Sequence, residues 1–202
     1  MKMVLVVLSF SCSLVLAAFS QVAGETNDRS PSSVGQLVED LYSPDPSVVT
    51  GAQEKLIKMS HRSVESRSEI ERRLVDLLDE PRAQQVTYSN AWYASAELLG
   101  NLKATQAIDA LARHLDYTNG IVGLSTAHVP AVRALVKIGK PTIPALSVAL
   151  SDDRPSIRSL AARALGDIGG HEAVSVLGNA AKSERDDDVK FNIAKALQTA
   201  RR

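Results

Sequence analysis

Residues 155–177 read PSIRSLAARALGDIGGHEAVSVL, and this stretch decides the fold. Six apolar side chains in it recur at i, i+3, i+4, i+7, i+8 and i+11, namely Ile157, Leu160, Ala161, Ala164, Leu165 and Ile168. That spacing places them on one face of a helix. Gly169 and Gly170 then end the helix, because glycine enters the left-handed conformation without strain. Val174 and Leu177 mark the apolar face of a second helix, so the stretch predicts a helical hairpin.

The hairpin recurs along the chain. At a shift of 66 residues, the segment 98–102 (LLGNL) falls on 164–168 (ALGDI). At a shift of 30 residues, 133–135 (RAL) falls on 163–165 (RAL), and weaker copies begin near residues 46 and 189. A period near 30 residues with two helices each time predicts a helical solenoid. We expect an all-α, right-handed α-solenoid of about four helix pairs over residues 34–202, with a cap helix at each end.

The repeats resemble HEAT-like repeats of the phycobilin-lyase type. The residues that carry the likeness are Ile157-Arg158, the run Ala164 to Gly169 and the run Ala173 to Leu177. The resemblance spans about residues 45–197 and implies stacked helical hairpins. It says little about function, because such repeats serve scaffolds, lyases and hydroxylases alike.

The N-terminus has the pattern of a secretory signal peptide. Lys2 is followed by an apolar run to Phe19, and no charged residue occurs between Lys2 and Glu25. We expect a signal peptide at residues 1–24 and a flexible lead at 25–33, with a mature protein that is periplasmic or secreted. An uncleaved membrane anchor is the alternative, because the run is close to spanning length.

Composition narrows the function classes. The chain has 23 basic and 23 acidic residues, and this balance lacks the basic excess of most nucleic-acid binders. Its one cysteine, Cys12, lies in the predicted signal peptide, so the mature chain would have no disulfide and no thiolate metal site. We expect no nucleic-acid partner, no membrane contact after cleavage, and a monomer.

Catalytic motifs are weak. His171-Glu172 begins like the zinc motif HExxH, but Ser175 stands where the second histidine belongs. Gly123 to Ala127 loosely resembles a nucleophile elbow, which requires a strand that the sequence does not predict. We therefore predict no catalytic residue, no metal site and no cofactor.

Two alignment columns of the repeats are basic. Arg133, Arg163 and Lys195 share one column, and Arg158 shares another with His128 and Lys190. Column mates lie side by side in stacked repeats, so Arg133, Arg158 and Arg163 could form a partner-binding stripe. Alternatively, these residues pair with nearby aspartates such as Asp152, Asp153 and Asp167.

Aromatic residues gather around the second repeat. Trp92, Tyr88 and Tyr93 are neighbours in sequence, and Tyr117 ends the second helix of the same hairpin. Trp92 aligns with Arg158, which suggests that its ring lies outside the core. The uncharged stretch 117–132 adds Ile121 and Leu124 beside two glycines. We predict a partner-binding edge here; alternatively, Trp92 packs the long loops onto the repeat.

The sequence thus favours a non-enzymatic protein-interaction module, with an extended groove lined by the second helices of the hairpins. A bilin-lyase-like enzyme or enzyme accessory subunit is the alternative.

Overall fold

The computed structural model describes residues 33–85, 89–117 and 129–202 of the 202-residue chain. The chain divides into two units, Met1–Ser32 and Ser33–Arg202. The predicted signal peptide therefore lies outside the described residues, as does the predicted lead up to its last residue. Ser33, that last residue, is the N-cap of the first helix, because its hydroxyl accepts a hydrogen bond from the Gln36 amide at 3.2 Å.

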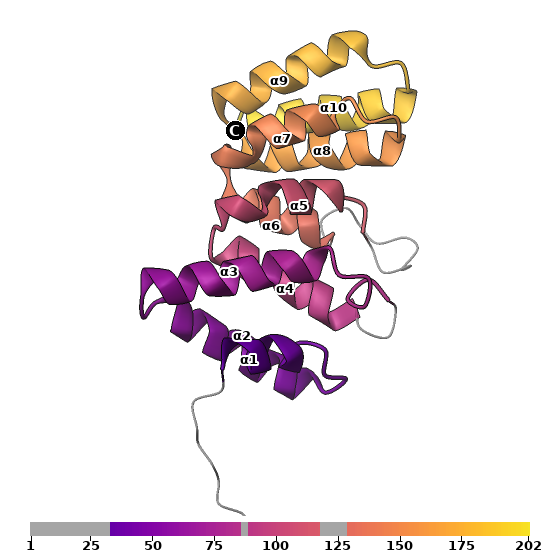
Figure 1. Cartoon of the computed structure of the whole chain (residues 1–202). Coiled ribbons are helices and arrows are strands. Elements are labelled where there is room, and N and C mark those ends of the chain that lie inside the picture. Colours follow the sequence, from indigo (N-terminus) through magenta and orange to yellow (C-terminus); the bar gives the residue numbers. More distant parts are fainter. Residues whose placement is uncertain (1–32, 86–88, 118–128) are drawn as a thin grey trace, which may run out of the picture. The chain divides into compact units, whose positions relative to one another are not determined.

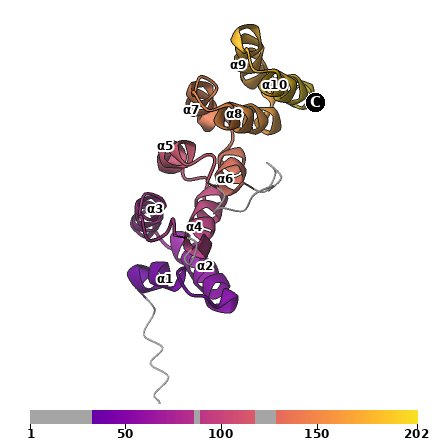
Figure 2. The ribbon, with the colours of Figure 1, turned by 90° about the vertical axis from the view of Figure 1, so that its right-hand side faces the viewer.

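The second unit is a row of helical hairpins, and its described residues contain no strand (Figure 1). A short helix, α1 (Val34–Asp40), precedes the first hairpin. The first helices of the hairpins, here called the A helices, are α2 (Pro46–Ser60), α4 (Ser89–Asn101), α6 (Pro130–Ile138), α8 (Pro155–Ile168) and the terminal α10 (Asp187–Ala200). The second helices, the B helices, are α3 (Val64–Leu78), α5 (Ile108–Arg113), α7 (Ile143–Ala149) and α9 (Gly170–Ser183). The A helices form one layer and the B helices another (Figure 2), so the predicted α-solenoid is confirmed.

Local chemistry explains the helix ends. Asp45 caps α2, where its carboxylate accepts the Ser47 amide at 2.8 Å and Pro46 occupies the first turn. Gly139 and Gly169 end α6 and α8 with φ of 87° and 68°, which side chains rarely tolerate. The glycine turn predicted from the sequence is therefore present.

The two middle B helices are shorter than predicted. The apolar spacing of the sequence predicts second helices over residues 105–116 and 141–150, but each begins as a 3-10 turn, η2 (Thr105–Ala107) and η4 (Lys140–Thr142). Neither turn has a side-chain cap. The sequence pattern also predicts a first helix near residues 127–138, and in the structure this helix begins at Pro130, where a missing N–H costs nothing. Ala127 itself lies outside the described residues.

The core is a strip of Leu, Ile, Val and Ala side chains between the two layers. Leu165 is fully buried, as the repeat register requires. Neighbouring A helices approach most closely where a glycine faces the next repeat. A Cβ atom on Gly100 would lie 2.8 Å from the Ala134 Cα, and one on Gly166 would lie 2.9 Å from the Ala196 Cα.

Candidate interaction groove

Trp92 corrects the predicted aromatic edge, because its side chain is completely buried. The ring packs against His114 and Tyr117, with centroids 6.2 Å and 4.4 Å away. Its indole N–H donates to the Leu78 carbonyl at 3.2 Å, at the C-terminal end of α3. Trp92 is a core residue that packs against the ends of α3 and α5, and the alternative that it holds the long loops stays a prediction where those loops lie outside the described residues.

The other aromatic residues are divided between core and surface. Tyr93 and Tyr117 are half-buried, and burial raises the pKa of both phenols. Tyr93 extends from α4, and its ring lies 6.3 Å from that of Trp92. Tyr88, Ile121 and Leu124 lie outside the described residues, so their part of the predicted edge stays a prediction.

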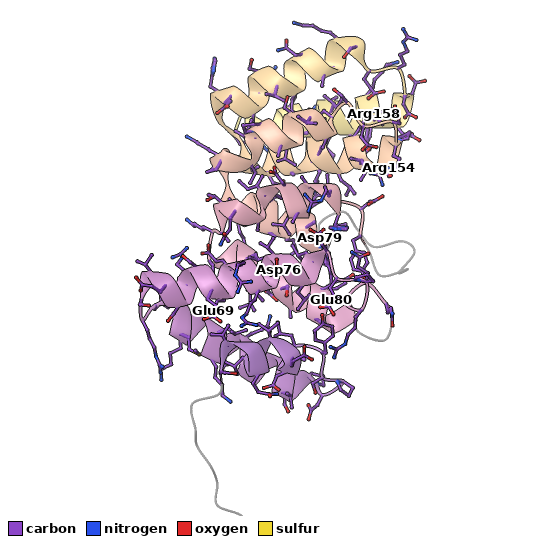
Figure 3. The ribbon with its side chains drawn as sticks, viewed as in Figure 1. Glu69, Asp76, Asp79, Glu80, Arg154 and Arg158 are labelled. Atoms are coloured by element: carbon purple, nitrogen blue, oxygen red, sulfur yellow. The ribbon has the colours of Figure 1, made fainter. Side chains whose placement is uncertain are left out.

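Arg158 is also not part of an open basic stripe. Arg158 extends from the first half of α8 (Figure 3). Its guanidinium forms a fork with the Glu184 carboxylate, at 2.8 Å and 3.1 Å, and donates to the carbonyls of Asp152 and Asp153. The hydrogen bonds from Arg158 are the main reason that the pKa of Glu184 falls to about 2. Arg158 therefore links the start of α8 to the end of α9.

The remaining basic column is paired within and between repeats. Arg163 bonds to Asp167 one turn away at 3.3 Å, and Arg133 approaches Glu97 of the preceding repeat at 3.9 Å. The alternative of ion pairing, rather than a stripe of open charges, therefore describes these residues. The predicted acceptor was correct for Arg163, whereas glutamates are the main partners of Arg133 and Arg158.

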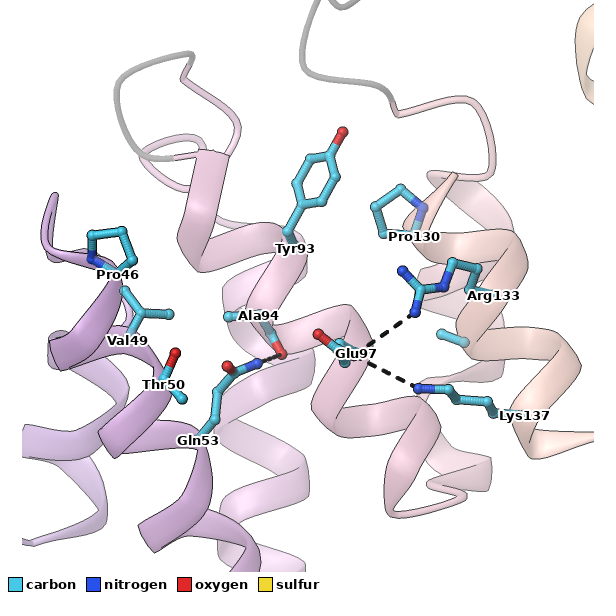
Figure 4. A pocket seen from close by; sticks show the side chains of 11 residues that line it. Pro46, Val49, Thr50, Gln53, Tyr93, Ala94, Glu97, Pro130, Arg133 and Lys137 are labelled. Atoms are coloured by element: carbon cyan, nitrogen blue, oxygen red, sulfur yellow. Dashed lines mark hydrogen bonds and ion pairs between the residues drawn. The ribbon is translucent and has the colours of Figure 1, made fainter. Parts of the chain in front are cut away.

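A groove crosses three A helices where they lie side by side (Figure 4). Helices α2 and α6 each contribute positions i, i+3, i+4 and i+7, which fall on one helix face. The lining residues are Pro46, Val49, Thr50 and Gln53 of α2; Tyr93, Ala94 and Glu97 of α4; and Pro130, Arg133, Ala134 and Lys137 of α6. We call this hollow the A-helix groove, and its volume is about 270 Å³.

The groove has an apolar floor and a charged rim. Val49, Ala94, Pro130 and Ala134 are buried at its base, whereas Glu97 and its basic neighbours are exposed. The Gln53 side chain reaches across from α2 and donates to the Ala94 carbonyl at 3.5 Å. This contact joins the first repeat to the second at the bottom of the groove.

Two cations share one carboxylate on the rim. Glu97 lies 3.9 Å from an Arg133 nitrogen and 3.8 Å from the Lys137 nitrogen (Figure 4). Both separations exceed the length of a good hydrogen bond. Lys137 donates instead to the Asn101 side chain at 2.7 Å. The rim thus carries one net positive charge, and the ion pairs that Arg133 and Lys137 form with Glu97 are long.

The A-helix groove lies on the A helices, and the predicted groove lined by B helices stays a prediction. A second hollow on the A side, between α8 and α10, is polar and has a volume of about 200 Å³. Arg163, Lys195 and Asn192 line it. Of the predicted partner-binding residues, the structure brings Tyr93 and Arg133 together in the A-helix groove.

The part of the chain that the structure describes contains no cluster of three or more potential metal ligands. None of the described helices is both long enough and apolar enough to span a bilayer.

Comparison with known proteins supports the repeat architecture. Residues 127–198 match the family model of HEAT repeats. Over these residues the helical hairpins are similar to HEAT repeats. No curated protein matches the chain closely enough to be reported as a relative.

Three solved structures are similar to this chain. An engineered protein is 22% identical with a TM-score of 0.40, covering 83% of this chain and 78% of its own. A designed armadillo repeat protein in complex with the peptide (KR)4 is 19% identical with a TM-score of 0.30. The match covers 84% of this chain and 100% of the designed protein. Another designed armadillo repeat protein is 18% identical with a TM-score of 0.28. The match covers 83% of this chain and 100% of that protein.

The sequence pattern did not indicate that Glu97, Lys137 or the α2 face of the groove belongs to a binding site. The usable signal was the pattern of Pro46, Val49, Thr50 and Gln53, which places a mixed polar and apolar stripe on one side of α2. The pairing of that stripe with α4 and α6 depends on how the repeats stack.

Proposed function

We propose that the protein is an exported, non-enzymatic interaction module whose protein partner binds in the A-helix groove. HEAT repeats generally serve as protein-interaction scaffolds, and their stacked helices create extended binding surfaces. One observation carries the choice of surface: three A helices from successive repeats combine a buried apolar floor with an exposed charged rim. That combination is typical of interfaces, where an apolar centre is surrounded by polar contacts.

Export is supported by the N-terminal sequence. A basic residue at position 2, an apolar run to Phe19 and the absence of charge up to Glu25 together resemble a cleaved signal peptide. The partner would then be an extracytoplasmic protein.

A substitution that fills the groove with a larger side chain tests the proposal. Thr50 is exposed on the groove wall, so Thr50→Trp should fill the hollow without disturbing the core. Thr105 is exposed on η2, outside the groove, and Thr105→Trp is the matched control. The wild type and Thr105→Trp should capture the same extracytoplasmic protein from the source organism, and Thr50→Trp should lose it at an unchanged melting temperature.

Equal capture by all three proteins would place the binding surface elsewhere. A chromophore or a metal ion bound to the purified wild type would contradict the non-enzymatic assignment and support the bilin-lyase-like alternative.

A further inference from the structure

We infer that the A-helix groove recognises a carboxylate that follows an apolar residue in an extended segment of the partner. This inference rests on the proposed function, because it specifies the chemistry of the occupant of the same groove. The carboxylate would lie between Arg133 and Lys137, and the apolar side chain would lie on the floor formed by Val49, Ala94 and Ala134.

The Arg133 guanidinium forms only a long ion pair. Its nearest carboxylate oxygen, on Glu97, is 3.9 Å away, and the guanidinium makes no hydrogen bond to any of the described residues. Arg158 provides the contrast, because two of its nitrogens bond to Glu184 at 2.8 Å and 3.1 Å. A guanidinium is suited to hold a carboxylate in such a fork. The N–H donors of the Arg133 guanidinium are therefore available to a ligand, whereas those of Arg158 are bonded to Glu184.

The geometry of α6 places a second cation beside the first. Arg133 and Lys137 are one helical turn apart, and both side chains extend toward Glu97 across the groove (Figure 4). About half of the Arg133 side chain is exposed (52%), compared with 37% of the Lys137 side chain. A ligand carboxylate could thus reach both cations from solvent, and it would compete with Glu97 for them.

The floor of the groove limits the size of the ligand group that binds beside the carboxylate. Its side chains are small, and the volume of about 270 Å³ falls below the range of about 300–1,000 Å³ for sites that enclose small molecules. An open hollow of this size suits one or two side chains of a peptide. Pro46 and Pro130 line opposite sides of it and offer no N–H that a peptide backbone would have to satisfy.

Two blocked tetrapeptides test the inference directly. The probe is acetyl-Val-Leu-Glu-Ala-amide, and its control is the same peptide with Gln in place of Glu, which keeps the shape and removes the charge. A third peptide, acetyl-Val-Leu-Gln-Ala with a free C-terminus, asks whether a chain-terminal carboxylate serves as well as a side-chain one. Binding to the ¹⁵N-labelled exported form is followed by NMR titration at low and high salt.

We expect saturable shifts of the amide signals of α4 and α6, with a Kd about fivefold lower for the Glu peptide than for the Gln peptide at low salt. This preference should shrink as salt is added. Arg133→Gln combined with Lys137→Gln should abolish it. Glu97→Gln should strengthen binding of the Glu peptide several-fold, because it removes the competing carboxylate. Arg185→Gln, at an exposed arginine on the loop before α10, should change nothing.

Equal affinity for the Glu and Gln peptides would overturn the inference, and so would weaker binding by Glu97→Gln. These outcomes are distinct from failure of the proposed function. Loss of the partner in Thr50→Trp together with equal peptide affinities would leave the function standing and reject the carboxylate. A clear preference for the Glu peptide, with partner capture unaffected by Thr50→Trp, would do the reverse.

Discussion

Trp92 and Arg158 occupy the same column of the repeat, and each donates a hydrogen bond to a backbone carbonyl that precedes its own helix. The indole N–H of Trp92 bonds to the Leu78 carbonyl at the end of α3, and the guanidinium of Arg158 bonds to the Asp152 carbonyl just after α7. The last carbonyls of a helix lack partners within the helix. The Trp92 N–H satisfies one of them, at Leu78, whereas the carbonyl that Arg158 binds lies in the loop beyond α7. At Trp92 and Arg158 the polar group of the side chain therefore makes a hydrogen bond within the fold, whereas Lys190 of the same column is exposed and pairs with Asp187.

Trp92→Ala should destabilise the fold by about 3–5 kcal/mol, because it removes the largest buried side chain. Trp92→Phe should cost less, since the ring packing survives and only the bond to Leu78 is lost. Denaturant unfolding measures both. A Trp92→Ala, Tyr117→Ala double variant that kept the wild-type midpoint would show that the aromatic cluster is not structural.

The Arg158–Glu184 pair should make stability depend on pH in a defined window. The folded pKa of Glu184 is about 2, against an ordinary value of 4.5. A lowered folded pKa stabilises the native state above pH 4.5, and this contribution is lost as the pH falls toward 2. Glu184→Gln should cost about 1–2 kcal/mol at pH 7 and nearly nothing near pH 2.

Urea unfolding at pH 7, 4.5 and 2.5 provides the comparison. Glu54→Gln, at an exposed position of α2, is the control and should follow the wild type throughout. A constant difference between the wild type and Glu184→Gln across this range would rule out the linkage.

At the scale of elements, one column decides how closely the A helices pack. Gly100 and Gly166 share it, and they face Ala134 and Ala196 of the next repeat. Ile57 and Val136 stand at the equivalent positions of α2 and α6. The contacts of α4 with α6 and of α8 with α10 are correspondingly the most extensive between A helices. A branched side chain holds two helices apart, whereas glycine allows backbones to approach.

Gly166→Ala should therefore cost about 1–3 kcal/mol, because the new methyl group would meet the Ala196 backbone at 2.9 Å. Gly178→Ala in α9 is the matched control, since nothing lies within 4 Å of its added Cβ. It should gain about 0.5–1 kcal/mol from helix propensity. Thermal unfolding of the two variants should shift in opposite directions, and a stabilised Gly166→Ala would refute the close contact.

At the scale of the whole molecule, the A-helix groove depends on the order of the repeats. Its floor combines residues of α2, α4 and α6, which are separated in the chain by B helices and loops. The loosely packed pair α2 and α4 leaves room on the A side, and Gln53 crosses that space to reach α4. No single hairpin contains the site.

Export is the prediction that concerns the complete chain. We expect the mature protein to begin between residues 19 and 25, because the apolar run ends at Phe19 and the first following charge is Glu25. N-terminal sequencing of protein from the extracytoplasmic fraction tests this. An intact Met1 in the membrane fraction would favour the uncleaved anchor.

The sequence by itself determined the repeat. Apolar spacing in residues 157–168 and the glycines at 169 and 170 are local signals, because helix faces and left-handed turns depend on nearby residues. Tertiary structure alone decided which polar side chains are held in hydrogen bonds to the neighbouring repeat, as Trp92 and Arg158 show. It also decided where the groove lies, because Val49, Glu97 and Arg133 meet only through the stacking of three repeats. Stacking depends on side-chain size at facing columns, and a periodic pattern does not encode that distance.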